Sequence, residues 1–314
     1  MHVESPASPV SRLRATAVSP ERFRQIAIAT AGMLLVIVAT GATVRLTASG
    51  LGCQHWPGCQ PGDPFPRKGY HSYVEFANRV VAFVTIVVTL VAAVASLLVA
   101  GLPRRVKWLA WGVFAGTFAQ APLGAITVYF HLNPYLVLSH LLLSLVVLGL
   151  GVVVALEAVE LLVGRASYLV PEIVRWGGLA VLLAAAVLLV SGTFVTASGP
   201  HSGGEDVRRL GAFPTAIWLH VRATAVFGVA FLGILGWSWR ERRRLPGALR
   251  SSLLLTGLLL VQMAIGEVQY RNALPWWLVL IHVTVAAAVW GWAVAVVAML
   301  WRPLAWRTGR ARPA

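Results

Sequence analysis

The chain has 314 residues, of which 58% are hydrophobic and only 12% are charged, and its mean hydropathy is +0.76. A water-soluble domain of this size cannot bury so much apolar surface, so we expect the lipid bilayer to solvate most of the chain. The formal net charge of +15 does not indicate nucleic-acid binding, because the basic residues are spread over five short segments and form no groove-binding element.

Long apolar stretches predict the membrane spans. The longest stretches without a charged residue cover 25–44, 80–103, 108–156, 176–204 and 272–301, and 210–239 and 251–270 contain one charge each. At roughly 20 apolar residues per crossing, with 108–156 counted as two spans broken at Asn133-Pro134, we predict eight transmembrane helices. The expected fold class is therefore an all-α integral membrane protein.

An internal repeat divides the chain into two halves. QAPLGAITVYFHLNPYLVLSH at 120–140 matches QMAIGEVQYRNALPWWLVLIH at 262–282, at an offset of 142. The sequence TASG occurs at 47–50 and again at 196–199, where the offset is 149 because the first external loop is longer. Four crossings return the chain to its starting side, so we predict two pseudo-symmetric four-helix bundles in parallel topology. The expected boundaries are a tail at 1–24, bundles at 25–162 and 174–301, a linker at 163–173 and a tail at 302–314.

The distribution of basic residues predicts the orientation. Of the 26 Lys and Arg residues, eighteen lie in the two tails and the loops on the same side of the predicted spans. The positive-inside rule assigns that side to the cytoplasm, with both termini, in a multi-pass protein of the cell membrane. Cys53 and Cys59 fall in the first external loop, where two thiols six positions apart predict a disulfide.

Three histidines lie inside predicted spans. His140, His220 and His282 each follow the external end of a helix by about six or seven residues, or roughly 10 Å. Ionisable residues at that depth mark functional sites, and a neutral imidazole keeps a lone pair for a metal. The alternative is that each histidine makes only an interhelical hydrogen bond.

The repeat predicts different iron sites in the two halves. His220 and His282 are expected to clamp one iron in the second bundle. In the first bundle His140 matches His282, but the position that matches His220 is Asn78, and asparagine is a poor iron ligand. We therefore expect a bis-histidine haem in the C-terminal half and a pocket with one histidine and an open coordination position in the N-terminal half.

These motifs resemble the haem A synthase family, the CtaA type, from the first span to the last. The resemblance is carried by GATVRLTASGLGCQHWPGC, VEFANR, QAPLGAITV, LNP, LSH, TASGPHSG and the histidines of WLH and LIH. It implies that the C8 methyl group of haem O is oxidised to a formyl group by successive hydroxylations, which gives haem A for cytochrome oxidase. It also implies a haem b cofactor on His220 and His282 and substrate haem O on His140. Members of the family usually have histidine where this chain has Asn78.

Glu75, Asn78 and Arg79 are expected to share one face of the second helix. One interpretation is an interfacial ion pair between Glu75 and Arg79. The resemblance supports another, in which Glu75 is catalytic beside the substrate methyl group and stabilises positive charge or manages protons. Arg79 and Arg222 would then bind haem propionates, with Asn78 in the substrate pocket. Arg45 is either a further propionate ligand or a helix-end arginine that snorkels.

The implied partners are haem O, with haem O synthase as its candidate supplier, membrane lipid, and an electron partner that the sequence does not identify. The sequence leaves open a homo-oligomer, a redox role for Cys53 and Cys59, and the role of Glu267. Two rival functions share the pocket features. A di-haem b electron-transfer protein needs two bis-histidine sites, which Asn78 argues against. A haem carrier or assembly factor without chemistry differs from an enzyme only through Glu75.

Overall fold

The computed structural model describes residues 18–53, 55–56, 58–67, 69–201 and 209–305. Eight long helices follow one another: α2 (Pro20–Leu46), α3 (Tyr70–Leu98), α4 (Arg104–Tyr129), α5 (Pro134–Val163), α6 (Glu172–Ser198), α7 (Phe213–Arg240), α8 (Pro246–Arg271) and α9 (Trp276–Trp301). All eight are long and apolar enough to cross a membrane, which confirms the predicted all-α, eight-span class. Among the described residues, β-type pairing is limited to two isolated bridges.

Polar caps followed by proline determine where two of the helices begin. The side chain of Ser19 accepts the N–H of Arg22 at 3.3 Å, and Pro20 occupies the first position of α2. The helix therefore extends into the tail that the sequence predicted to end at residue 24. At α5, Asn133 caps the N–H of Tyr135 at 3.0 Å and is likewise followed by proline.

The internal repeat is also present in the backbone. His131 and Leu132, between α4 and α5, have φ values of 50° and 58°, and Ala273 and Leu274, 142 residues later, have φ values of 57° and 58°. In each break the second residue donates its N–H to the carbonyl five positions earlier, at 2.9 and 2.8 Å. Non-glycine residues rarely adopt positive φ, so two such pairs at matching positions are a shared structural feature.

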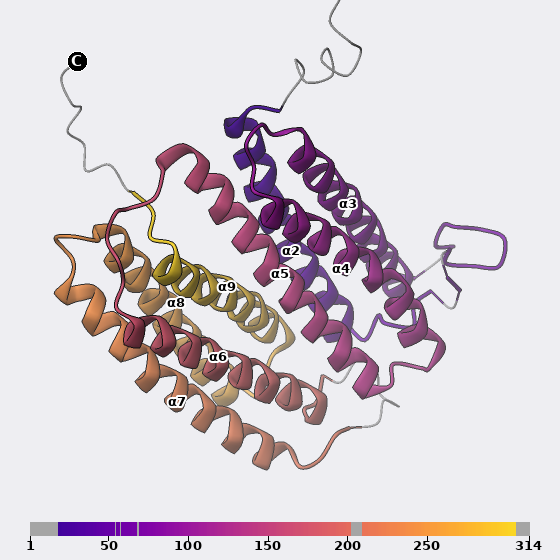
Figure 1. Cartoon of the computed structure of the whole chain (residues 1–314). Helices are drawn as coiled ribbons and strands as arrows, with labels where there is room; N and C mark the ends of the chain where they lie inside the picture. The colour runs from indigo at the N-terminus through magenta and orange to yellow at the C-terminus, as the bar shows by residue number, and fades with distance from the viewer. Residues whose placement is uncertain (1–17, 54, 57, 68, 202–208, 306–314) are drawn as a thin grey trace, which may run out of the picture.

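Helices α2–α5 pack together as one group and α6–α9 as a second (Figure 1). The first group has its own apolar core, in which Phe23 and Val106 are fully buried, and in the second Phe227 and Leu255 are fully buried. Helix α9 joins the groups, because it packs against α2 and α5 as well as against α6 and α8. The chain of α2 begins and that of α9 ends at the same end of the molecule (Figure 1).

Small side chains allow α9 to lie between the two groups. Ala287, Gly291 and Ala293 are among its buried residues. Helices in lipid associate by close packing and hydrogen bonds, since lipid chains are as apolar as the helix surfaces. Trp290 adds a polar contact, as its Nε1 donates to the carbonyl of Leu145 in α5 at 2.7 Å.

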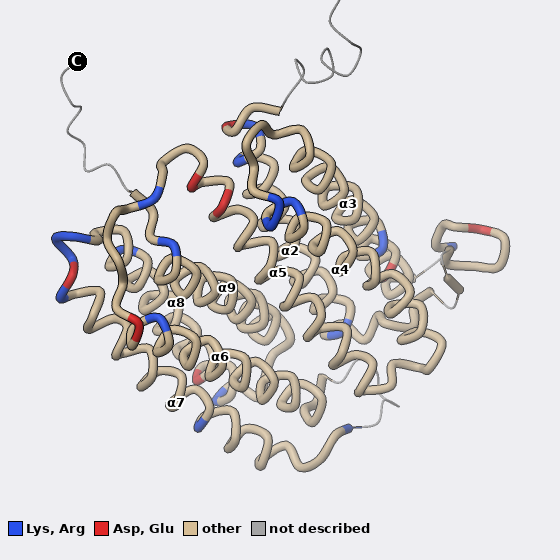
Figure 2. The backbone as a smooth tube through the Cα atoms, viewed as in Figure 1, with Lys and Arg blue, Asp and Glu red and all other residues tan. Residues whose placement is uncertain are grey.

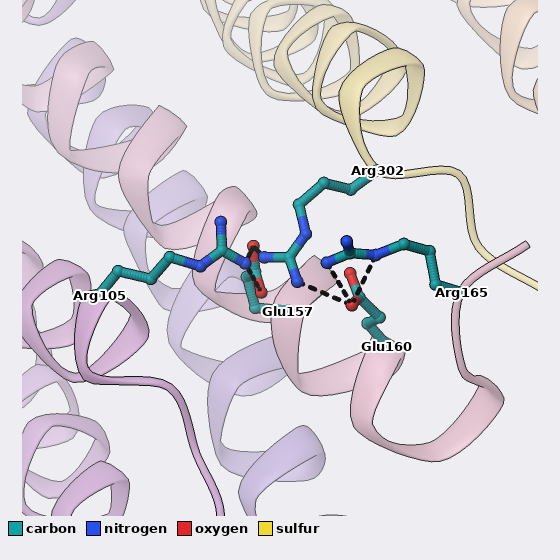
Figure 3. A network of polar contacts seen from close by, with 5 residues as sticks. All are labelled: Arg105, Glu157, Glu160, Arg165 and Arg302. Atoms are coloured by element: carbon teal, nitrogen blue, oxygen red, sulfur yellow. Dashed lines mark hydrogen bonds and ion pairs between the residues drawn. The ribbon is translucent and has the colours of Figure 1, made fainter. Parts of the chain in front are cut away.

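Most charged residues lie near the ends of the helices (Figure 2). At the end where α2 begins, five of them form the network drawn in Figure 3: Arg105, Glu157, Glu160, Arg165 and Arg302. Arg105 reaches both carboxylate oxygens of Glu157, at 2.8 and 2.9 Å, while Arg302 binds Glu157 and also Glu160, the latter at 2.8 Å. The network joins α4, α5 and the residue that follows α9.

Candidate functional site

The two histidines of the second helix group face each other. His220 on α7 and His282 on α9 have ring centres 6.5 Å apart, with the ring planes at 70°. If an iron lies about 2 Å from each ligating nitrogen, and each ring centre about 1 Å farther, the ring centres are roughly 6 Å apart. The observed spacing therefore fits the two axial ligands of one haem iron.

Neighbouring helices hold both rings in position. Ser191 Oγ on α6 contacts His220 Nδ1 at 3.0 Å. Each ring also lies against a glycine: a Cβ added at Gly192 would be 3.1 Å from Cε1 of His220, and one at Gly266 would be 3.1 Å from Cε1 of His282. Contacts of this kind orient a histidine so that one nitrogen faces a metal.

Hydrogen bonding alone does not account for the histidines. Nδ1 of His140 and Nδ1 of His282 are buried, and neither has a hydrogen-bond partner among the described residues. The ring of His220 contacts the hydroxyl of Ser191 through its Nδ1. No group of three or more His, Cys, Asp or Glu side chains with metal-binding geometry occurs in the described ranges.

The first helix group builds the same surroundings around His140. Gln120 Nε2 on α4 donates to the carbonyl of His140 at 3.2 Å, as Gln262 on α8 does to the carbonyl of His282 at 3.1 Å. A Cβ added at Gly124 would lie 3.6 Å from His140 Cε1. These glutamines and glycines belong to the repeated motif, but the sequence did not predict that they contact the histidines.

Asn78 has a hydroxyl partner that corresponds to that of His220. Thr40 Oγ1 on α2 donates to Asn78 Oδ1 at 2.8 Å, and Ser191 contacts His220 Nδ1 at 3.0 Å. Both hydroxyl residues are followed by glycine in the sequence. Thr40 and Ser191 are 151 residues apart, whereas the nearby TASG motifs are 149 residues apart. Because the two offsets differ, an alignment of the halves on TASG does not pair Thr40 with Ser191.

Glu75 lies in the first turns of α3 and is only 4% exposed. Its Oε2 accepts the backbone N–H of Cys53 at 2.7 Å, and its Oε1 pairs with Arg79 Nη2 at 2.5 Å. The ion pair, which was one of the two sequence interpretations, is therefore confirmed. The catalytic role of Glu75 stays a prediction.

The external loop after α2 closes over this ion pair. The predicted disulfide between Cys53 and Cys59 is confirmed, with an S–S distance of 2.02 Å. Arg79 Nη1 donates to the carbonyls of His55 and Gly58, both at 2.6 Å, and Nη2 lies 3.2 Å from the carbonyl of Cys53. The carbonyls of the disulfide-closed loop thus surround the guanidinium that binds Glu75.

A close approach to α3 and two contacts of Asp63 further fix this loop. A Cβ added at Gly52 would lie 2.4 Å from the carbonyl oxygen of His71, so the loop can approach α3 this closely only with glycine there. Farther along, the N–H of Phe65 donates to Asp63 at 3.0 Å and Arg67 pairs with the same carboxylate at 3.3 Å. These contacts, the backbone hydrogen bond first, lower the pKa of Asp63.

Two arginines expected near a haem have protein partners. The guanidinium of Arg222 lies 3.3 Å from the ring centre of Trp218 and donates to its carbonyl on the exposed side of α7. Residues two apart on a helix do not face the same way, so Arg222 is not brought beside His220. Arg45 does not snorkel: it donates to the hydroxyl and the carbonyl of Thr196 on α6, at 3.0 and 2.7 Å, and so links the two halves. The propionate roles of Arg79, Arg222 and Arg45 stay predictions.

Comparison with known proteins identifies the family. The model of the COX15-CtaA family, described as cytochrome oxidase assembly protein, matches residues 24–68 and 63–294. The chain is 31% identical over 140 residues to a heme A synthase of Bacillus pumilus and 30% identical over 173 residues to one of Lysinibacillus sphaericus. These matches cover 44% and 53% of this chain, and 45% and 55% of the relatives, so the chain spans about half the length of the relatives.

A longer match covers nearly all of a third relative. The heme A synthase of Symbiobacterium thermophilum is 28% identical over 289 residues, which are 86% of this chain and 92% of the relative. The family model itself extends over most of the chain, from the first helix into the last. The protein is thus a member of the COX15-CtaA family of cytochrome oxidase assembly proteins.

Proposed function

We propose that the protein is a haem A synthase, which oxidises the C8 methyl group of haem O to a formyl group and so supplies haem A for cytochrome oxidase. The observation that carries this proposal is the facing pair His220 and His282, with ring centres 6.5 Å apart, in a member of this family. All three relatives described above are named heme A synthases, which supports the same function.

In this proposal the bundle at 174–301 holds haem b. His220 and His282 would hold its iron, and Ser191 would fix the imidazole of His220 for that role. When bound, haem b supplies one-electron redox chemistry inside the membrane.

The bundle at 25–162 binds the substrate haem O, which haem O synthase supplies. His140 orients the substrate iron, and Asn78 lies on the helix opposite. Arg79 and Arg222 bind haem propionates by charge-assisted hydrogen bonds, Arg79 in addition to its pairing with Glu75. Glu75 is the catalytic residue: a carboxylate near the methyl group accepts a proton that oxidation releases and stabilises positive charge that develops there.

Water supplies the oxygen atom of the formyl group in the proposed reaction. Two successive hydroxylations convert the methyl group into a geminal diol, which loses one water molecule to leave the formyl group. In total, one methyl group and one water give one formyl group, four protons and four electrons. An oxidised electron carrier of the membrane, of the quinone class, takes up the electrons.

We further propose that the protein lies in the cell membrane with both termini in the cytoplasm. Basic residues at the end where α2 begins and α9 ends support this orientation, because cytoplasmic loops are enriched in Lys and Arg (Figure 2). The segment at 163–173 is then a cytoplasmic linker between the two bundles, and both haem pockets open towards the external face.

The variant Glu75→Gln tests the enzymatic proposal against a haem carrier. Glutamine keeps the length of the side chain and an acceptor for the N–H of Cys53, but it accepts no proton. We expect at least roughly 100-fold slower formation of formyl haem, with the haem content of the purified protein unchanged. Formyl haem at the wild-type rate would contradict the catalytic role, and loss of bound haem would mark Glu75 as structural.

A matched control is Glu267→Gln. Glu267 also pairs with an arginine four residues later, Arg271, at 2.5 Å, but the two side chains are 58% and 75% exposed. The same chemical change there is expected to leave both haem content and product formation at wild-type levels.

A further inference from the structure

We propose that the N-terminal pocket binds its haem through a single protein ligand, His140, and that Asn78, oriented by Thr40, presents an amide N–H to the open axial position. This inference rests on the proposed function, since it concerns the haem of that pocket. It assigns a role to a residue pair, Thr40 and Asn78, that the proposed reaction does not require.

The two halves differ at the position opposite the repeated histidine, which is Asn78 in the first half and His220 in the second. The helix breaks have matching φ values, and His140 and His282 are each contacted by a glutamine and a glycine of the repeated motif. Asn78 and His220 each contact a hydroxyl that precedes a glycine on the preceding helix. By this correspondence Asn78 faces His140 as His220 faces His282.

The hydroxyl contacts leave different atoms of His220 and Asn78 without a protein partner among the described residues. Ser191 engages Nδ1 of His220, which leaves Nε2 for an iron. Thr40 donates to Oδ1 of Asn78, so the acceptor of that amide is used, and its Nδ2 has no hydrogen-bond partner in the part of the chain described. An amide nitrogen carries two N–H donors and no lone pair for a metal. The same hydroxyl contact therefore orients a ligand in one half and a hydrogen-bond donor in the other.

The two ionisable side chains next to Asn78 on α3 are bound by other groups of the protein. Glu75, three residues before Asn78, is held by the N–H of Cys53 and by Arg79. Arg79 is itself surrounded by carbonyls of the disulfide loop. Neither group supplies a second axial ligand in this arrangement. The iron opposite His140 is then free to take an exchangeable small ligand, to which Asn78 donates a hydrogen bond.

Carbon monoxide is a suitable probe, because it binds reduced haem iron only where an axial position is open. The full-length protein, purified after expression with a supply of haem O and then reduced, is titrated with carbon monoxide while total haem is counted. We expect two haems per chain and one bound carbon monoxide. Asn78→His is expected to abolish carbon monoxide binding and to convert the second haem to a low-spin spectrum.

Two milder variants test the role of the amide. Asn78→Ala and Thr40→Val should keep one carbon monoxide per chain but release it roughly fivefold to tenfold faster, the factor expected for one lost hydrogen bond. Thr43→Val is the matched control, because the hydroxyl of Thr43 donates to the carbonyl of Ala39 in its own helix, at 3.0 Å. Its release rate should equal that of the wild type.

Two results would overturn the inference while leaving the proposed function standing. One is wild-type protein with two haems per chain that binds no carbon monoxide, because a second protein ligand would then be present. The other is a release rate unchanged by both Asn78→Ala and Thr40→Val. Failure of the proposed function looks different: His140→Ala would then lower neither the haem content nor carbon monoxide binding, which would contradict the N-terminal haem site and this inference together.

Discussion

Glu160 and Arg302 are 142 residues apart, which is the offset of the internal repeat, and they form an ion pair with each other at 2.8 Å. Equivalent positions in the two halves thus carry opposite charges where the halves meet (Figure 3). Two copies of the same half would bring like charges together at this point. The pair therefore favours association of unlike halves, which is how a chain with a repeated architecture specifies one arrangement.

Removing Arg302 should loosen this contact between the halves. Arg302→Ala leaves Glu157 and Glu160, whose side chains are 9% and 16% exposed, with one fewer cation. Because Arg105 and Arg165 remain, we expect a loss of about 2 kcal/mol rather than the full effect of breaking a buried pair. Thermal unfolding of the detergent-solubilised protein measures it.

The control for that variant is Arg271→Ala, which breaks the exposed pair with Glu267. An exposed pair contributes below about 1 kcal/mol, so this variant should unfold close to the wild-type temperature. Equal shifts in the two variants would show that the network at the end of α9 has no special part in joining the halves.

Gly52→Ala should displace the loop segment whose backbone holds the carboxylate of Glu75. The added Cβ would lie 2.4 Å from the carbonyl of His71, so the loop must move away from α3 and withdraw the N–H of Cys53 from Glu75. We expect a fall in formyl haem production of at least roughly tenfold, as one charge-assisted hydrogen bond is lost. Gly32→Ala, where no neighbouring atom lies within 4 Å, is the control. Wild-type activity in Gly52→Ala would show that the loop does not position Glu75.

The haem ligands of the second half can be tested by spectroscopy and redox titration. His282→Ala should remove the low-spin haem b, whereas Ser191→Ala should retain it with a shifted midpoint potential, because the hydroxyl tunes the imidazole of His220. His55→Ala is the control. His55 is exposed, and it contacts Arg79 through its backbone carbonyl, which the substitution keeps. An unchanged haem spectrum in His282→Ala would rule out the proposed site.

Reporter fusions test the orientation. Alkaline phosphatase, which is active only outside the cytoplasm, should be active when fused after Leu132, between α4 and α5, and inactive when fused after Arg243, between α7 and α8. The reverse pattern would contradict the assignment of both termini to the cytoplasm.

Parts of the fold and site could be predicted from the sequence because the bilayer constrains them strongly. Eight apolar stretches, the 142-residue repeat and the depth of His140, His220 and His282 follow from span length and spacing. The start of α2 differed because a local cap at Ser19 extends the helix beyond its apolar part. The contact of Arg222 with Trp218 was not predicted, and its expected role at a haem propionate stays a prediction.

Other contacts in the site could not be predicted from a single sequence. The hydrogen bond from Cys53 to Glu75 uses a backbone N–H, which every non-proline residue carries, so the residue type at position 53 does not predict it. The match between Thr40 and Ser191 is hidden because its offset differs from that of the adjacent motif. Both contacts depend on how a loop or helix end is positioned in space.

The measurement that tests the central claim most directly is identification of the haems in the purified full-length protein, made with a supply of haem O and an electron carrier. The extracted haems are separated by chromatography, identified by mass and counted per chain. Our account predicts haem b together with haem A or a hydroxylated form of haem O. Two haem b molecules per chain would contradict it in favour of electron transfer, and haem b beside unaltered haem O would contradict it in favour of a carrier.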